Sequence, residues 1–324
     1  METLVTDSPA HAATFVADGR LVAFPTETVY GVGAPAFNPH LIRRIFDVKG
    51  RPSDNPLIVH IGRKADFGLI GSIPNDYTKA LVDAFFPGPL TVVVPRTGAV
   101  PDVVTAGLDT VAIRMPDHPV GRAFLLACDT PMAAPSANLS GRPSPTTWSA
   151  VLQDLGGRIP CILNGGRSKV GLESTVVDCT GDSPVILRSG AYSLRELQKV
   201  VPTCTQVSQD ELTSLKSPGV HHKHYAPNAT VVVVNGEWPP AFERKSGYIG
   251  LEQLPPDKEC DLVHVCADVE EYGRLLFSFF RECEDRGLPT IYCLKPSLDG
   301  LGMAIADRLT RAAAATADIS SAAR

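Results

Sequence analysis

The sequence of 324 residues lacks the features that would place it in several specialised protein classes. No apolar run approaches the ~20 residues needed to cross a bilayer. The start, Met-Glu-Thr-Leu-Val-Thr-Asp, lacks the basic residues and apolar core of a signal peptide. No Walker pattern occurs, and the pair Gly31 and Gly33 lacks the third glycine of a dinucleotide fingerprint. We therefore expect no membrane segment and no standard nucleotide-binding motif.

Cysteine is sparse and shows no pairing pattern. The 8 cysteines, from Cys128 to Cys293, never form Cys-x-x-Cys, and most lie in apolar runs, where cysteine behaves as a small hydrophobe. We predict reduced thiols in a cytoplasmic protein rather than disulfides or a zinc site. Three histidines precede Tyr225, but no cysteine or carboxylate stands at ligand spacing, so we expect no metal site there.

The chain also lacks a surplus of basic charge, since its formal net charge is −5. Residues 1–209 contain 18 acidic and 18 basic side chains, whereas residues 210–324 contain 17 and 12. A tight non-specific nucleic-acid binder would normally carry a basic excess, so RNA binding is disfavoured as the main function. It stays open as an alternative because residues 43–51 include four cations that could form a local patch: Arg43, Arg44, Lys49 and Arg51.

What is present is typical of a globular α/β protein, with 44% hydrophobic and 20% charged residues. The length allows two domains. In the first part, short apolar runs predict strands at 21–24, 57–61, 90–94 and 111–115, and caps and periodicity predict helices at 9–18, 39–49, 76–85 and 119–128. We divide the chain into a first domain at 1–202, a stiff linker at 203–229 and a small domain at 230–324.

The small domain alternates strands and helices. Strands are predicted at 231–234, 247–251, 262–265 and 290–294, and helices at 268–286 and 302–315. This alternation predicts a doubly wound parallel sheet of the Rossmann or flavodoxin kind. We find no nucleotide fingerprint in it.

Polar side chains gather at the ends of the predicted strands in residues 21–62. Thr26, Glu27 and Thr28 follow one strand, and Lys49 and Arg51 precede the next one, which carries His60. Proline and glycine fix the backbone of both loops. A surface loop is the commoner role for such a turn, but the combination suits a phosphate site.

Further strands end in groups that could bind a ligand. Arg114 lies between apolar neighbours, which is costly unless the charge is paired or points into a site. Small and hydroxyl-bearing residues follow the strand near Met132, and Ser174 and Arg188 lie at the ends of two later strands. Scattered surface polarity would not usually repeat in this way, so we expect these side chains to converge.

These runs resemble the YrdC-like L-threonylcarbamoyladenylate synthases in their long, two-domain form. The resemblance covers nearly the whole chain. It rests on five runs in residues 21–190: Pro-Thr-Glu-Thr-Val-Tyr-Gly, Lys-x-Arg-Pro-x-x-x-Pro-Leu-x-x-His, Pro-Ser-Ala-Asn-x-Ser-Gly, Glu-Ser-Thr-Val-Val-Asp and Arg-x-Gly. The linker matches through Pro218, Gly219, His224, Tyr225 and Pro227, but has Val220 where the family usually has Met.

The resemblance implies a twisted mixed sheet with flanking helices for the first domain. It implies synthesis of threonylcarbamoyl-AMP and pyrophosphate from ATP, L-threonine and bicarbonate, with Mg²⁺ accompanying ATP. A separate transferase would then pass the threonylcarbamoyl group to the tRNA adenosine beside the anticodon. The alternatives are an RNA-binding module and a carbamoyl-adenylating enzyme with another acceptor.

Site residues carry over by motif. The threonine-binding residues would be Thr28, His60, Arg114, the Ala134 backbone and Ser174, with Arg114 pairing the carboxylate. The ATP-binding residues would be Arg51, Asn55, Thr110, Ser136, Ser144, Arg188 and Tyr225. Lys49 and Arg51 would be catalytic, neutralising charge on the phosphates. We also expect the linker to close over the site through Tyr225.

Overall fold

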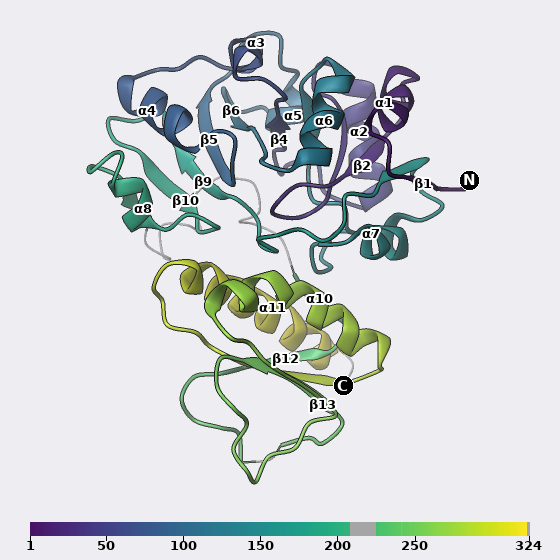
Figure 1. Cartoon of the computed structure of the whole chain (residues 1–324), viewed down its shortest axis with the longest axis vertical. Helices are drawn as coiled ribbons and strands as arrows, with labels where there is room; N and C mark the ends of the chain where they lie inside the picture. Colours follow the sequence, from purple (N-terminus) through teal and green to yellow (C-terminus); the bar gives the residue numbers. More distant parts are fainter. Residues whose placement is uncertain (208–224, 241, 323–324) are drawn as a thin grey trace.

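The computed structural model describes residues 1–207, 225–240 and 242–322. They form two α/β domains, each built on its own sheet (Figure 1). Within this described part, no helix is long and apolar enough to cross a membrane. Pro218, Gly219, Val220 and His224 of the expected linker lie outside the described residues.

The larger sheet has 11 strands in the order β1-β8-β2-β3-β7-β4-β6-β5-β9-β10-β11. Parallel pairs such as β4 with β6 adjoin antiparallel pairs such as β5 with β6, so the predicted mixed sheet is confirmed. The strands are β1 (Leu4–Thr6), β2 (Val22–Phe24), β3 (Gly31–Pro35), β4 (Ile58–His60), β5 (Leu90–Pro95), β6 (Thr110–Arg114), β7 (Met132–Ala134), β8 (Cys161–Leu163), β9 (Thr175–Asp178), β10 (Val185–Arg188) and β11 (Thr205–Gln206). The last, β11, lies inside the predicted linker.

Helices cover both faces of this sheet. Because side chains alternate along a strand, Val22 and Phe24 of β2 pack with α1 and α6, whereas Ala23 belongs to the core that contains α2, α4 and α7. The helices are α1 (Pro9–Ala17), α2 (Pro39–Lys49), η1 (Lys64–Asp66), α3 (Phe67–Ile70), α4 (Asp76–Phe85), α5 (Asp102–Thr105), α6 (Pro119–Cys128), α7 (Trp148–Leu155) and α8 (Leu194–Gln198).

The limits of α2 follow from its sequence. The Asn38 side chain accepts hydrogen bonds from the N–H groups of His40 and Leu41, so the helix begins at Pro39. It ends where Gly50 adopts a left-handed conformation with φ of 61°. Lys49 is therefore the last helical residue, and Arg51 enters the following loop.

The smaller sheet is entirely parallel, as predicted, with the order β12-β15-β13-β14. Its strands are β12 (Thr230–Val234), β13 (Ser246–Gly250), β14 (Leu262–Val265) and β15 (Thr290–Leu294). Both helices, α10 (Val269–Asp285) and α11 (Leu301–Ala322), pack on one face of it. The other face is covered by side chains of the β12–β13 and β13–β14 connections, including Trp238, Phe242 and Leu254. Helices on both faces, which a doubly wound sheet would have, are not found among the described residues, because those two connections form none.

The two helices α10 and α11 form the layer that faces the larger domain (Figure 1). Arg281 of α10 is ion-paired with Asp154 of α7 at 2.8 Å, and Arg308 of α11 with Glu173 at 3.1 Å. All four residues are buried. Since a buried charge is tolerated only when it is paired, these bridges fix how the domains meet.

Candidate active site

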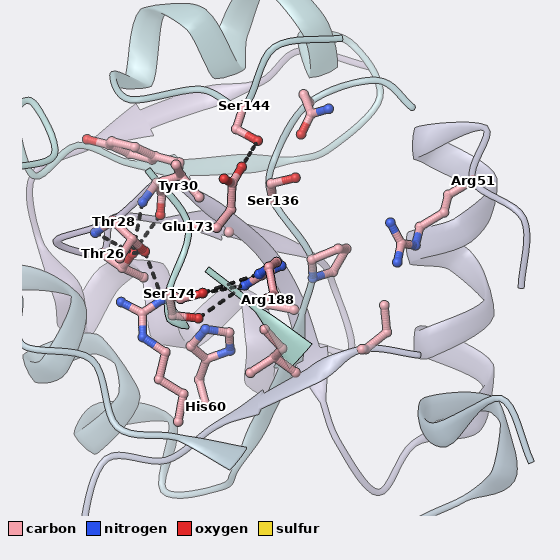
Figure 2. A pocket seen from close by; sticks show the side chains of 18 of the residues that line it. Thr26, Thr28, Tyr30, Arg51, His60, Ser136, Ser144, Glu173, Ser174 and Arg188 are labelled. Carbon is pink, nitrogen blue, oxygen red and sulfur yellow. Dashed lines mark hydrogen bonds between the residues drawn. The ribbon is translucent and has the colours of Figure 1, made fainter. Parts of the chain in front are cut away.

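A cavity lies where several strands of the larger sheet end, and Tyr225, which packs in the core of the smaller domain, forms part of its wall. The space within it, including its mouth toward solvent, is about 710 Å³. Its lining comes from the β2–β3 loop, the ends of β4, β6, β7 and β10, the approach to β9, and Tyr225. The convergence of polar residues from separate strand ends is therefore found in the structure (Figure 2).

Arg114 and His60 are placed side by side by strand register. Each is the last residue of its strand, and they are partners in the parallel pair β4–β6. The Arg114 NH1 group donates to Thr28 Oγ1 at 2.8 Å, Nε donates to the Gly88 carbonyl at 3.3 Å, and NH2 lies 2.8 Å from Glu27 Oε1. The NH2 group thus pairs with Glu27 by charge and has no hydrogen-bond partner among the described residues.

His60 is buried at the same end of the cavity and packs edge-on against Phe24. Burial, together with the nearby positive charge of Arg114, lowers its pKa to about 3. The imidazole is therefore neutral at physiological pH. Its Nδ1 atom has no hydrogen-bond partner among the described residues, which is costly unless a ligand supplies one.

Ser174 and Arg188 form one hydrogen-bonded unit in the cavity wall. Arg188 donates to the Ser174 carbonyl from Nε and NH2 at 3.2 and 3.0 Å, and NH2 also donates to Ser174 Oγ at 3.2 Å (Figure 2). Burial lowers the pKa of Arg188. Gly190 is the glycine of the Arg-x-Gly run. A side chain would not fit at this position, because a Cβ there would lie 2.3 Å from the Thr175 nitrogen. The strand exit and the start of β9 can approach this closely only with glycine.

Arg51 lies across the cavity from Thr26 and Thr28 (Figure 2). Its NH2 group donates to the Asn55 carbonyl at 3.4 Å, and its Nε is buried without a hydrogen-bond partner in the described part of the chain. Burial, and to a smaller extent the charge of Arg188, lower its pKa to about 10. A bound anion would favour the charged form of Arg51 and so offset the effects of burial and of Arg188 on its pKa.

Three predicted residues do not line this cavity. Lys49 is buried, and its Nζ donates to the carbonyls of Ser136, at 2.6 Å, and of Asn138. The Lys49 side chain therefore fixes the loop that carries Ser136 rather than facing the cavity. Asn55 is buried next to the lining residue Pro56, and Thr110 begins β6 at the strand end far from Arg114.

The other predicted residues are brought together in the lining: Thr28, Arg51, His60, Arg114, Ala134, Ser136, Ser144, Ser174, Arg188 and Tyr225. Polar side chains outside the threonine-binding, ATP-binding and catalytic sets also line it: Thr26, Tyr30, Asn138, Arg142 and Glu173. Tyr30 donates to the Gly166 carbonyl at 2.7 Å, and Glu173 accepts from Ser144 at 2.6 Å. Glu173 stands beside Ser174 in the Glu-Ser-Thr run, which was the available signal for it.

The lining does not build a metal site of its own. Glu173 is the one carboxylate among the described lining residues, and its two oxygens accept hydrogen bonds from Ser144 and Arg308. Nowhere in the described chain do three His, Cys, Asp or Glu residues group as metal ligands. Divalent ions prefer several oxygen ligands, so a cation here would have to arrive with an anionic ligand that supplies them.

Comparison with known proteins decides the family. One family profile, described as "Telomere recombination", matches residues 14–190, and a second, described as "Threonylcarbamoyl-AMP synthase, C-terminal domain", matches residues 192–314. The chain is 40% identical over 317 residues to the threonylcarbamoyl-AMP synthase of Pyrococcus abyssi, covering 93% of this chain and 92% of that protein. The chain belongs to the threonylcarbamoyl-AMP synthase family. The resemblance noted from the sequence motifs is thereby confirmed.

Two further relatives agree with this assignment. The threonylcarbamoyl-AMP synthase of Bacillus subtilis is 39% identical, with 96% of this chain and 95% of that protein covered. A crystal structure of P. abyssi Sua5 complexed with L-threonine has a TM-score of 0.87 and 37% identity, covering 97% of this chain and 98% of that one. The family resemblance thus extends over both domains.

Proposed function

We propose that the protein is a nucleotidyltransferase that makes threonylcarbamoyl-AMP and pyrophosphate from ATP, L-threonine and bicarbonate. The observation that carries this proposal is a single cavity lined by two chemically different groups of side chains, which we assign to a threonine end and a nucleotide end. Arg114, Thr28 and neutral His60 suit a small amino acid. The remaining lining arginines suit a polyphosphate: Arg51, Arg142 and Arg188.

The threonine end can orient an amine for attack. The guanidinium of Arg114, whose NH2 group has no hydrogen-bond partner among the described residues, would hold the carboxylate, while Thr28 and Ser174 offer hydroxyls and Ala134 lies in the wall. A neutral His60 can accept a hydrogen bond or donate one without repelling the ammonium form of the substrate. We propose that the free amine then attacks the carbon of bicarbonate, giving a carbamate and releasing water.

The nucleotide end would carry out the second step by positioning and charge stabilisation. A carbamate oxygen attacks the α-phosphorus of ATP, the bond to the bridging oxygen breaks, and pyrophosphate leaves. Arg51 and Arg188 would neutralise the phosphates, and Mg²⁺ would come bound to them. Lys49 would act indirectly, by holding the Ser136 loop against the nucleotide. Asn55 and Thr110 stay weaker proposals, since neither lines the cavity.

We further propose that residues 1–202 form the catalytic domain, that residues 230–324 support it, and that the segment 203–229 closes the site. Of that segment, Tyr225 is described and lines the cavity. A separate transferase would deliver the threonylcarbamoyl group to tRNA. The eight free cysteines suit a reducing compartment, and we propose the cytoplasm.

RNA binding through residues 43–51 is not favoured by their placement. Lys49 is buried against carbonyls and Arg51 lines the cavity, which leaves Arg43 and Arg44 on the outer side of α2. Two cations make a much weaker phosphate-binding surface than four.

The proposal is tested by pyrophosphate release from ATP in bicarbonate buffer, with each standard amino acid in turn. We expect release that requires both bicarbonate and L-threonine and that is lost in a folded Arg114→Ala variant. Release with a different amino acid would mean that this amino acid, and not L-threonine, is the substrate whose amine is carboxylated. No amino-acid-dependent release from the wild-type chain would refute the proposal.

A further inference from the structure

Arg308 links the smaller domain to the cavity. It lies on α11 and is fully buried. Its Nε donates to Glu173 Oε2 at 3.1 Å, and its NH1 donates to the Ser189 carbonyl at 2.7 Å, so both contacts cross into the larger domain. Arg308 itself does not line the cavity, whereas Glu173 does. A residue of the smaller domain therefore reaches the back of the cavity wall.

Glu173 is an unusual group in this position. Its other oxygen, Oε1, accepts a hydrogen bond from Ser144 at 2.6 Å, and both residues line the cavity among four arginines. Because like charges repel strongly when water is excluded, an unneutralised carboxylate would oppose the binding of a polyphosphate. The Arg308 guanidinium cancels that charge from outside the cavity.

Tyr225 is held by the same group. The Arg308 guanidinium carbon lies 5.4 Å from the centroid of its ring, whose other contacts include a stack on Phe277 of α10 at 5.4 Å. The Tyr225 backbone has φ of 67°, which is uncommon for a residue other than glycine. The next residue, Ala226, donates its N–H to the Gly141 carbonyl at 2.9 Å. Tyr225 thus takes its place in the cavity wall through contacts with both domains.

We infer that Arg308 is a positioning residue for nucleotide binding, through which the smaller domain neutralises Glu173 and fixes Tyr225 and Ser144 in the cavity wall. The smaller domain then contributes to the site by charge as well as by support. This inference rests on the proposed function for the identity of the nucleotide. It predicts an effect on ATP rather than on L-threonine, because Ser144, which Glu173 holds, and Tyr225, which Arg308 holds, belong to the predicted ATP-binding residues.

A neutral side chain of similar length tests this role in the full-length chain. We expect Arg308→Met to weaken ATP binding by about tenfold or more, measured by calorimetry with Mg²⁺-ATP, with the KM for L-threonine changed less than about twofold. The double variant Glu173→Gln with Arg308→Met should recover most of the lost affinity, because it removes the charge that Arg308 neutralises. A structural clamp would give the opposite result, since the double variant would bind no better than the single one.

Arg311→Met serves as the matched control. Arg311 lies about one turn along α11 and pairs with Asp307 at 2.9 Å, a carboxylate that Arg308 NH1 also contacts at 3.0 Å. Arg311→Met therefore removes a neighbouring cation of the same cluster while leaving the Arg308–Glu173 pair in place. The Arg311→Met protein should bind ATP with the same affinity as the wild type. If Arg308→Met does not fold, Arg308→Lys replaces it, because lysine retains the positive charge. The loss of ATP affinity caused by Arg308→Lys should then be smaller when Glu173 is present than in the Glu173→Gln background.

The outcomes separate the inference from the proposed function. Wild-type protein that neither binds ATP nor releases pyrophosphate refutes the function. Active wild-type protein whose folded Arg308 variants bind ATP normally, or whose double variant is not rescued, overturns the inference alone.

Discussion

Arg114 and Glu27 form an ion pair 2.8 Å long, in which the side chains are only 4% and 6% exposed. The predicted carboxylate-binding arginine is therefore already neutralised. A ligand carboxylate would share it with Glu27 and Thr28, which keeps a buried positive charge from standing alone when the site is empty. Without Glu27, the buried positive charge of Arg114 at the end of β6 would have no ion-pair partner, and its burial would destabilise the folded protein.

Glu27→Gln should destabilise the protein and make it depend on ligand. Breaking a buried pair by removing one partner typically costs about 3–5 kcal/mol, because the other charge is left uncompensated. A substrate carboxylate would replace the missing charge, so L-threonine should raise the melting temperature of this variant more than that of the wild type. Thermal unfolding with and without L-threonine measures both effects.

The exposed pair Arg96–Asp102 provides the control for this variant. Asp102 is 77% exposed, so Asp102→Asn should change stability by less than about 1 kcal/mol and leave the response to L-threonine unchanged. Equal responses of the Glu27→Gln protein and the wild type to L-threonine would mean that Glu27 does not share Arg114 with the ligand.

His60 should make stability fall in acid. Its pKa is about 3 in the folded protein and near 6.5 in the unfolded chain, so between these values the unfolded state binds the additional proton. Stability attributable to His60 is thus complete above about pH 6.5 and declines toward pH 3, by at most about 1.4 kcal/mol per pH unit. Urea unfolding between about pH 7 and 4.5 should show a shallower decline for His60→Asn than for the wild type. Parallel curves would contradict the burial of a neutral imidazole.

Lys49→Met should loosen the Ser136 loop. Two carbonyls, those of the half-buried Ser136 and the buried Asn138, would lose their donor, at a cost of about 1–3 kcal/mol each at most. We expect lower stability together with weaker ATP binding. The exposed Arg43→Met substitution on the same helix should change neither. Normal stability with abolished pyrophosphate release would instead support the original prediction that Lys49 acts directly on the phosphates.

Metal removal should stop the reaction without weakening the protein. Since the described residues form no cluster of metal ligands, Mg²⁺ is expected to bind with ATP. EDTA should abolish pyrophosphate release and leave the melting temperature of the ligand-free protein unchanged. A fall in that temperature would reveal a metal held by the protein.

Local signals in the sequence predicted much of the framework. The cap at Asn38 and the glycine at 50 define α2, and the apolar runs near His60 and Arg114 are strands β4 and β6. Motif residues that follow strands converge because strand ends meet at one edge of a sheet. These features depend on short-range chemistry, which a sequence states directly.

Features that depend on distant contacts were not predicted. Strands β1 and β8 pair across more than 150 residues, and neither run is long enough to stand out alone. Lys49 looked like a phosphate-binding cation because its burial against Ser136 arises from folding and not from spacing. Likewise, nothing in the sequence of α11 shows that Arg308 meets Glu173, which lies 135 positions away.

The central claim is tested most directly by following bicarbonate carbon into the product. The protein is incubated with Mg²⁺-ATP, L-threonine and ¹³C-bicarbonate, and the nucleotides are examined by mass spectrometry. We expect threonylcarbamoyl-AMP carrying the label, formed together with pyrophosphate and missing in the Arg114→Ala reaction. Pyrophosphate release with no labelled threonylcarbamoyl-AMP, under conditions in which that compound is stable, would contradict the account.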